Sequence, residues 1–288
     1  MSESHAARPL AVLGAGVMGC GIATLAVGFG LPVVLVDVDE DKLASAGRTI
    51  ARELRLAALM GALPPGVATG GLTTSASVAD VAGAELVIEA VTEDAAVKAE
   101  ALASLSGIVA PDTPVVSNTS SIPIGELANS LRHPETFLGT HFMNPPYLIE
   151  TVEVIRGDRT GDAALGRLES VLARLGRKPL TVGDNPGFVT SRVLHPMIND
   201  AVRVVEEGTA TPETVDALFV GCLGHRTGPL RTADLIGLDN LADSLRVLHE
   251  RTGDEGCKPR ELLLAKVRAG DLGQKSGRGF YEYGGAKS

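Results

Sequence analysis

The chain lacks the features that mark several classes of protein. Its cysteines, Cys20, Cys222 and Cys257, lie far apart and form no CxxC or zinc-type spacing, so we expect free thiols in a reducing compartment, with no metal site. The opening segment MSESHAARPLAVLGAG has no long apolar core behind a basic head, unlike a signal peptide or a membrane anchor. We therefore expect a cytoplasmic protein with no membrane partner.

Positive charge is also scarce. The 288 residues include 26 Lys and Arg against 35 Asp and Glu, a formal net charge of −9. This balance argues against nucleic acid or an anionic membrane as the main partner. The hydrophobic fraction of 44% and charged fraction of 21% are those of an ordinary globular protein. The length suffices for two domains, or for one large α/β domain with an appendage.

The first part of the chain alternates strand and helix patterns. LAVLGAGVMGCGIATLAVGFG reads as a strand, a glycine turn and a packed helix, and PVVLVDVDE reads as a second strand. A helix is expected from about 40 to 60, further strands at 84–91, 113–120 and 136–142, and a helix between the first two of these. Continuous β-branched runs are typical of parallel strands covered by helices. The pattern predicts an α/β fold with a doubly wound, Rossmann-type sheet.

The pattern changes after the segment KPLTVGDNPGF, residues 178–188. The segments that follow read as helices, and Thr211 before Pro212 is a typical N-cap and first-turn pair. We therefore expect an α/β domain at 1–185 and an all-α domain at 186–288.

A glycine pattern connects the first strand to the first helix. Gly14, Gly16 and Gly19 form G-x-G-x-x-G, and Asp37 ends the next strand. These glycines permit a tight turn and a close approach of a pyrophosphate to the helix N-terminus. Asp37 would accept hydrogen bonds from the adenosine ribose and repel a 2′-phosphate, which favours NAD over NADP and makes 1–185 an NAD-binding domain. The competing interpretation is a tight turn without a ligand. The residues expected at the cofactor in this loop are Gly14, Ala15, Gly16, Val17, Met18 and Gly19.

The stretch HFMNPPYLIETVEV, residues 141–154, combines a histidine with two acids. His141 ends an expected strand, where it would face a bound nicotinamide. An imidazole there can remove the hydroxyl proton of an alcohol, and a carboxylate on its far nitrogen would orient it. Glu150 and Glu153 are expected on opposite faces of the next strand, so periodicity does not choose between them. A lone histidine at a strand end is otherwise a packing or surface residue.

Six motifs in order resemble the 3-hydroxyacyl-CoA dehydrogenase family, in particular its short single-chain 3-hydroxybutyryl-CoA dehydrogenase members. They are VLGAGVMG, VIEAVTED, SNTSSI, GTHFMNPPYLIETVEV, DNPGFVTSR and GQKSGRGFYEY. The resemblance implies a catalytic pair of His141 and Glu153, which leaves Glu150 structural. It implies that Ser120 hydrogen-bonds the substrate near its hydroxyl and that the protein is a homodimer. It also implies further contacts with NAD from Asn144, Glu93, Lys98 and Lys275.

The chain departs from the family pattern in its helical part. Ser191 stands where relatives have an asparagine against the substrate carbonyl, and Thr227 stands where they have an apolar residue. Both hydroxyls are expected at the substrate. His195 lies one helical turn after Ser191 on the same face, where it either approaches the site or packs.

A second departure lies in the expected helix at 40–60. Glu53 and Met60 align, without gaps, with a serine and a lysine that relatives offer to the CoA nucleotide. Arg48, Arg52 and Arg55 make this helix basic, which suits a phosphate, an acidic protein or merely a solvated face.

The leading hypothesis is an NAD-dependent enzyme that interconverts a 3-hydroxyacyl thioester and its 3-oxo form. The thioester is carried either by CoA or by an acyl carrier protein. In the second case we expect a hydroxylated three-carbon acyl group, as in polyketide extender-unit biosynthesis. Two rival hypotheses are a dehydrogenase of free hydroxy acids and a non-catalytic dinucleotide-binding protein, since fold alone does not fix function.

Overall fold

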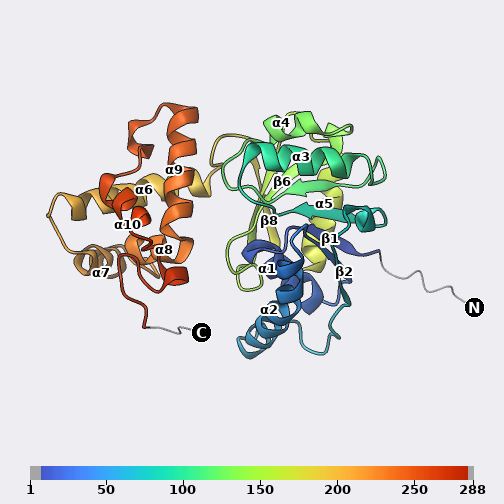
Figure 1. The fold of residues 1–288 in the computed structure, drawn as a ribbon, viewed down its shortest axis with the longest axis horizontal. Coiled ribbons are helices and arrows are strands. Elements are labelled where there is room, and N and C mark those ends of the chain that lie inside the picture. Colours follow the sequence, from blue (N-terminus) through green and yellow to red (C-terminus); the bar gives the residue numbers. More distant parts are fainter. Residues whose placement is uncertain (1–7, 285–288) are drawn as a thin grey trace, which may run out of the picture. The chain divides into compact units, whose positions relative to one another are not determined.

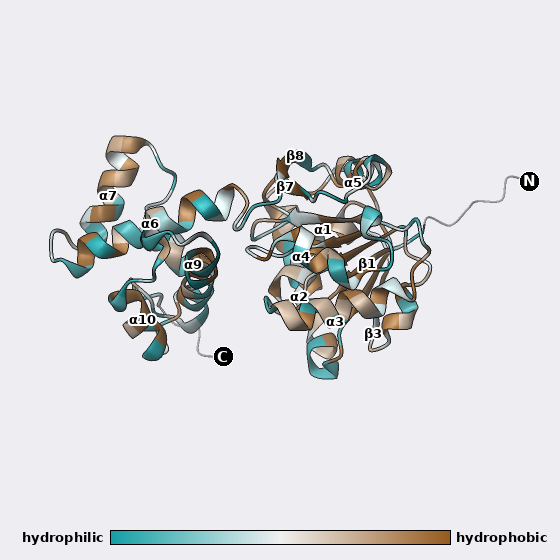
Figure 2. Ribbon diagram, turned by 90° about the horizontal axis from the view of Figure 1, so that it is seen from above, coloured by the Kyte–Doolittle hydropathy of each residue, from teal (hydrophilic) through white to brown (hydrophobic). Residues whose placement is uncertain are grey.

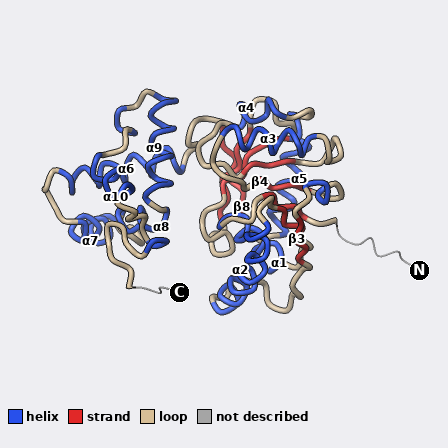
Figure 3. Tube along the Cα trace, viewed as in Figure 1, coloured by secondary structure: helices blue, strands red, loops and turns tan. Residues whose placement is uncertain are grey.

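The computed structural model of the chain, shown in Figure 1, describes residues 8–284. The chain divides into two compact units, one within residues 1–184 and the other within 185–288. Figure 3 shows strands surrounded by helices in the first unit, and helices joined by loops in the second.

The first unit is built on an eight-stranded sheet in the order β3-β2-β1-β4-β5-β6-β7-β8. Neighbouring strands are parallel except for β6 and β7, which are antiparallel. The expected doubly wound α/β fold is confirmed. Its strands are β1 (Leu10–Leu13), β2 (Val33–Val36), β3 (Leu72–Ser75), β4 (Leu86–Glu89), β5 (Val115–Ser117), β6 (Phe137–His141), β7 (Thr151–Arg156) and β8 (Lys178–Gly183).

Helices cover both faces of this sheet. Leu10 and Val12 of β1 pack in one core cluster with Ile22 of α1 and Leu168 of α5. Figure 1 shows α3 and α4 together on the side of the sheet opposite α1 and α2, and Figure 2 shows the strands between them as largely hydrophobic. The helices of this unit are α1 (Val17–Gly28), α2 (Glu40–Leu59), α3 (Ala95–Ser106), α4 (Ile124–Leu127) and α5 (Asp162–Arg174).

The antiparallel pair results from the short connection between β6 and β7. Residues 142–150, which contain two prolines and a cis bond between Asn144 and Pro145, join the two strands without a helix. Parallel neighbours need a long crossover, so a connection this short returns the chain antiparallel. The last residue of β6 therefore lies beside the early part of β7.

The second unit is helical. Leu230, Leu241 and Leu245 are fully buried in its core, and beyond isolated bridges no strand occurs among its described residues, 185–284. Within residues 8–284, none of the helices has the length and apolar character needed to cross a membrane. The helices of this unit are α6 (Thr190–Glu206), α7 (Pro212–Leu223), α8 (Pro229–Ile236), α9 (Leu238–Thr252) and α10 (Glu261–Arg268).

Two buried aspartates hold the end of the chain against these helices. Asp234, 1% exposed, accepts hydrogen bonds from the main-chain N–H groups of Phe280 and Tyr281 and from the hydroxyl of Tyr283. Burial, together with this hydrogen bond to Asp234, raises the pKa of Tyr283 to about 12. The Tyr281 hydroxyl donates to Asp216. These hydrogen bonds hold the motif GRGFYEY against the helices of this unit.

Candidate active site

His141 and Glu153 form a buried pair across the antiparallel strands. They are register partners in β6 and β7, and each is 6% exposed. Nδ1 of His141 lies 3.0 Å from Oε2 of Glu153. A carboxylate only accepts hydrogen bonds, so this contact assigns the Nδ1 proton to the histidine and leaves Nε2 as the basic nitrogen.

Ser120 lies on the other side of the imidazole. Its Oγ is 3.1 Å from Nε2 of His141. Since Nε2 carries the lone pair in this tautomer, the serine hydroxyl donates to it. Ser120, His141 and Glu153 thus form a line. The imidazole contacts the Glu153 carboxylate through Nδ1 and the partly buried Ser120 hydroxyl through Nε2. This arrangement suits Nε2 of His141 to accept a proton from a hydroxyl placed beside it.

Glu150 does not share a strand with Glu153. The expectation that both acids lie on the same strand was wrong, because β7 begins at Thr151 and Glu150 still belongs to the turn. Its side chain is exposed and pairs with Lys178 Nζ at 2.7 Å, at the start of β8. The hydrogen bond and charge of Lys178 hold the pKa of Glu150 below its ordinary value. The geometry therefore singles out Glu153 as the partner of His141.

The glycine loop after β1 has the shape of a phosphate cradle. Gly14 has φ +108°, and a Cβ there would lie 2.5 Å from the carbonyl oxygen of Ala90 after β4. A Cβ on Gly19 would lie 1.7 Å from the carbonyl oxygen of Gly14, whereas one on Gly16 would meet nothing within 4 Å. Gly16 therefore borders open space at the N-terminus of α1, where no side chain caps the helix. These features fit the pyrophosphate of a dinucleotide.

Asp37 closes the same cradle from the end of β2. It is 9% exposed, and its Oδ2 accepts a hydrogen bond from the N–H of Ala15 at 2.7 Å. Oδ1 accepts from the N–H of Asp39 at 2.9 Å. Each carboxylate oxygen has a second lone pair, so the same group fits the ribose hydroxyls expected there.

Glu93 lies behind the turn that carries Ser120. Its Oε1 accepts hydrogen bonds from Thr119 Oγ1 at 2.7 Å and from the N–H groups of Ser120 and Ser121 at 2.8 and 3.0 Å. Desolvation raises the pKa of Glu93, but the ammonium of Lys98 and these hydrogen bonds outweigh it and hold the pKa below the ordinary value. The structure thus brings Glu93 to the site as a carboxylate.

Two family profiles together match nearly the whole described part of the chain. The 3-hydroxyacyl-CoA dehydrogenase NAD binding domain matches residues 9–185, and the 3-hydroxyacyl-CoA dehydrogenase C-terminal domain matches residues 187–283. The chain belongs to the 3-hydroxyacyl-CoA dehydrogenase family. It is an NAD-dependent oxidoreductase that acts on a CH–OH group.

Individual relatives agree with this assignment over the full chain. A probable 3-hydroxybutyryl-CoA dehydrogenase of Deinococcus radiodurans is 41% identical over 94% of this chain and 99% of its own. The crystal structure of M. tuberculosis FadB2 is 38% identical, with a TM-score of 0.90 over 96% of this chain and 99% of its own. That of the (S)-3-hydroxybutyryl-CoA dehydrogenase PaaH1 from Ralstonia eutropha is 37% identical, with a TM-score of 0.85 over 96% and 99%.

Asn144 lies in the turn between the strands of this dehydrogenase. It is exposed and precedes the cis peptide bond to Pro145. The base of the turn is tied to β5, because the N–H of Phe142 donates to Oδ1 of Asn118 at 3.0 Å. Asn144 is therefore an exposed residue three positions beyond His141, on an anchored segment.

Four residues named from the sequence lie in the helical unit. Ser191 is 3% exposed in the first turn of α6, and the side chain of His195 lies 2.7 Å from Ser244 Oγ in α9. Lys275 Nζ donates to Asp239 at 2.6 Å. Thr227 is exposed, lies 3.0 Å from Thr232 Oγ1, and borders a hollow of about 370 Å³ with Arg231 and Tyr281 among its lining residues. Within this unit the side chain of His195 is thus buried and hydrogen-bonded to Ser244.

The basic face of α2 ends in apolar side chains. Arg48, Arg52 and Arg55 are exposed, as are Leu59 at 84% and Met60 at 63%. Glu53 points back to α1 and accepts a hydrogen bond from Thr24 Oγ1 at 3.0 Å.

Burial raises the pKa of Glu53, against the lowering effects of the hydrogen bond from Thr24 and the charge of Arg52. Glu53 therefore belongs to the contact between α1 and α2.

The three cysteines are free thiols, as their spacing predicts. Cys20 is buried and donates to the carbonyl oxygen of Ala15. Burial, with the charges of Glu53 and Asp37, raises the pKa of Cys20 to about 11. Cys257 is also buried, and burial raises its pKa too, whereas Cys222 is exposed. Because the thiolate is the reactive form, neither buried cysteine is suited to nucleophilic chemistry at neutral pH.

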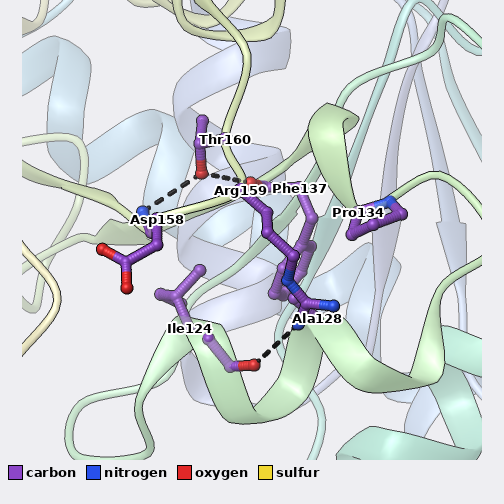
Figure 4. A pocket seen from close by; sticks show the side chains of 9 residues that line it. Ile124, Ala128, Pro134, Phe137, Asp158, Arg159 and Thr160 are labelled. Carbon is purple, nitrogen blue, oxygen red and sulfur yellow. Dashed lines mark hydrogen bonds between the residues drawn. The ribbon is translucent and has the colours of Figure 1, made fainter.

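A separate hollow of about 400 Å³ lies where β6 begins (Figure 4). Phe137, Ile124 and Thr160 line it, and Arg159 at its rim donates to the carbonyl oxygen of Gly125. His141 is at the other end of β6, roughly 13 Å away at the rise of a strand. The hollow is therefore distinct from the line of Ser120, His141 and Glu153. Among residues 8–284, no group of His, Cys, Asp and Glu side chains is arranged to hold a metal ion.

Sequence reasoning missed two buried polar residues beside the site, Glu89 and Asn118. Glu89 is 0% exposed at the end of β4, and Asn118 is 8% exposed after β5. An acid that ends an apolar strand is a recognisable signal, since a buried carboxylate requires partners. The identity of those partners depends on the fold.

Proposed function

We propose that the enzyme oxidises the 3-hydroxyl of an acyl thioester to the 3-oxo group, and catalyses the reverse reaction, with 3-hydroxybutyryl-CoA as the type of substrate. The observation that carries this proposal is the line of Ser120, His141 and Glu153, in which Nε2 is a proton acceptor beside a hydroxyl donor. Relatives named as 3-hydroxybutyryl-CoA dehydrogenases support the substrate class.

His141 acts as the general base. On binding, the substrate hydroxyl replaces the Ser120 hydroxyl as the donor to Nε2, and Ser120 donates to the substrate oxygen instead. The proton moves to Nε2 as the carbon–hydrogen bond breaks. The imidazole then carries protons on both nitrogens, and in the reverse reaction it returns the proton from Nε2 to the oxygen. NAD, when bound, supplies the acceptor for the hydride.

Glu153 keeps Nε2 of His141 available as the proton acceptor. Its carboxylate fixes the Nδ1 proton and is 3.0 Å from the positive charge that develops on the ring. Because the two side chains are only 7% and 6% exposed, water screens this attraction little. Ser120 orients the substrate oxygen against Nε2, since its hydroxyl is already within hydrogen-bonding distance of that nitrogen.

The cofactor is held on the carboxyl edge of the sheet. The main-chain N–H groups at the N-terminus of α1 face the pyrophosphate, beside the open space at Gly16. Asp37 receives the adenosine ribose, and the exposed Asn144 faces the nicotinamide half. Glu93, Lys98 and Lys275 complete the set of NAD contacts that the family resemblance suggests.

Residues 186–288 form the substrate and dimerisation domain in this proposal. Ser191 and Thr227 supply hydroxyls to the acyl group in place of an amide and an apolar side chain. Two helical domains pair in a homodimer through apolar helix faces.

The test is a panel of substrates followed at the NADH absorbance. 3-Hydroxybutyryl-CoA, free 3-hydroxybutyrate and a sugar acid are compared at equal concentration. Reduction of NAD with the CoA thioester, and its loss in His141→Gln, supports the proposal. Turnover of the free acids alone contradicts it. Binding of NAD without turnover of any member, or of the same acyl group on a carrier protein, indicates a non-catalytic protein.

A second candidate function is favoured by the surface of α2. Three exposed arginines and the exposed apolar end at Leu59 and Met60 complement an acidic carrier protein better than a CoA nucleotide alone. In this second function the acyl group is a hydroxylated three-carbon unit, whose extra hydroxyl would satisfy Ser191 and Thr227.

One comparison separates the two carriers. kcat/KM is measured for the same acyl group on CoA and on acyl carrier protein, with the wild type and with Arg48, Arg52 and Arg55 changed to Glu. A preference for the carrier protein that disappears in the triple variant supports the second candidate. A preference for CoA that the triple variant retains rejects it.

A further inference from the structure

A buried charge network lies behind the turn that carries Ser120. Glu89, at the end of β4, is fully buried. Its Oε1 accepts hydrogen bonds from Lys98 Nζ and the N–H of Val91, both at 2.8 Å, and its Oε2 accepts from Ser117 Oγ at 2.5 Å. A carboxylate this deep requires several donors to replace water, and the structure supplies three.

Lys98 connects this carboxylate to a second one. Its side chain is 1% exposed, and Nζ lies 2.8 Å from Glu89 Oε1, 3.3 Å from the carbonyl oxygen of Val91 and 3.3 Å from Glu93 Oε2. An ammonium has three N–H donors, and these three acceptors account for all of them. Lys98 therefore joins the carboxylates of Glu89 and Glu93.

Glu93 connects Lys98 to the turn at residues 119–121. While Oε2 faces Lys98, Oε1 receives the donors of three consecutive residues, Thr119, Ser120 and Ser121, at 2.7 to 3.2 Å. One oxygen therefore fixes the main chain on both sides of the Ser120 side chain.

We propose that Glu89 and Lys98 are positioning residues for catalysis. They hold the Glu93 carboxylate, and through it they hold the Ser120 hydroxyl opposite Nε2 of His141. The inference rests on the proposed function, because it gives Ser120 the task of orienting the substrate hydroxyl. It adds two residues that touch neither substrate nor reacting atoms.

In this proposal the charges of Glu89 and Lys98 set the position of the Glu93 carboxylate, and so they affect kcat as well as the stability of the fold. Two carboxylates share one ammonium. Lys98 and Glu89 are buried, so water screens their attraction little, whereas the side chain of Glu93 is 39% exposed. Glu89→Gln keeps the shape of the side chain but removes its charge, so the ammonium is then attracted to Glu93 alone. Oε2 moves toward Lys98, and Oε1 moves out of line with the turn. A displacement of about 1 Å at a reacting group can lower the rate by up to about 10²-fold.

The experiment is a double-mutant cycle on kcat with 3-hydroxybutyryl-CoA and NAD. We expect Glu89→Gln to lower kcat about tenfold in the wild type and less than about twofold in a Ser120→Ala background. Equal factors in both backgrounds would show a role that does not act through Ser120, and would overturn the inference. Ser106→Ala is the matched control: Ser106 is buried on the same helix as Lys98 and accepts from the N–H of Arg132 at 2.6 Å, and kcat should not change.

A milder variant and a second readout cover the case in which Glu89→Gln does not fold. Ser117→Ala removes only the hydroxyl donor at Oε2, and its smaller effect on kcat should also vanish in the Ser120→Ala background. In the cofactor-free protein, the ¹⁵N shift of His141 Nε2 should move in the same direction in Ser117→Ala and Ser120→Ala, and no further in the double variant. Independent, additive shifts would reject the coupling.

The two proposals fail in different ways. If Ser120→Ala leaves kcat unchanged, the catalytic role of Ser120 falls and the proposed function must be revised. If Ser120→Ala lowers kcat while the changes at Glu89 and Ser117 act additively with it, only the network inference falls.

Discussion

Nδ1 of His141 lies 3.0 Å from Oε2 of Glu153, across register partners of an antiparallel strand pair. The pairing depends on the turn at residues 142–150, because its length sets which residue of β7 lies beside the end of β6. A shift of one residue would turn the carboxylate to the other face of the sheet. The contact between His141 and Glu153 is thus a consequence of strand register.

Replacement of the base gives the most direct prediction. His141→Gln should lower kcat by about 10² or more, the scale of a lost general base. Affinity for NAD should remain close to that of the wild type, because the glycine loop and Asp37 are untouched. Steady-state kinetics and NAD binding by calorimetry measure the two effects. Wild-type turnover in this variant would remove His141 from the mechanism.

Glu153, the proposed orienting acid, has a matched control in Glu150, three residues away. Glu153→Gln should lower kcat by about tenfold or more, since the neutral amide no longer stabilises the imidazolium. Glu150→Gln removes the same charge from the exposed pair with Lys178 and should leave kcat unchanged. Equal losses in the two variants would indicate a general effect of charge on the turn.

The fold was predictable wherever apolar runs are continuous. β1, β2, β4, β5 and β6 are buried along most or all of their length and were expected from their sequences. The edge strands β3 (LTTS) and β8 (KPLTVG) were missed, because most of their side chains are exposed and no apolar run marks them. α5 was also missed, although Ala164, Leu168 and Val171 follow helical spacing.

The site was predictable where a motif carries chemistry, and not where it depends on contacts between distant segments. The glycine loop and His141 follow from local patterns. Glu153 was separated from Glu150 by resemblance, and the strand boundary at Thr151 supplies the physical reason. The contacts of Glu89 join residues from β4, β5 and α3, so no local pattern reveals them.

Cofactor preference should depend on Asp37. The carboxylate at the end of β2 would repel a 2′-phosphate, so NAD should be used better than NADP. Asp37→Ala should narrow this preference, chiefly by raising the KM for NAD. The measurement is kcat/KM for both cofactors, and a wild type that prefers NADP would contradict the assignment. Asp39→Ala, two residues later at the half-buried N-cap of α2, is the control and should leave the preference unchanged.

The helical unit should associate. α7 exposes Leu218 at 54%, Val220 at 45% and Leu223 at 63%, and apolar side chains in such number on one helix indicate an interface. Light scattering at micromolar concentration should give the mass of a dimer. Leu223→Asp should shift it toward the monomer, whereas Leu59→Asp on α2 should not. A monomeric wild type would contradict the expected assembly.

The stability of the site should vary with pH through Glu93. The pKa of Glu93 is lower in the folded protein than its ordinary value of 4.5, so its ionised form favours folding above that pH. This contribution is lost as the pH falls from about 4.5 through the folded pKa. Glu93→Gln should therefore lower the urea midpoint at pH 7, and the difference from wild type should shrink below pH 4.5. Glu100→Gln, an exposed acid of α3, is the control and should show no such pH-dependent difference. A difference between wild type and Glu93→Gln that stays constant from pH 7 to pH 3.5 would show that the amide disturbs packing, and that the charge of Glu93 does not stabilise the turn.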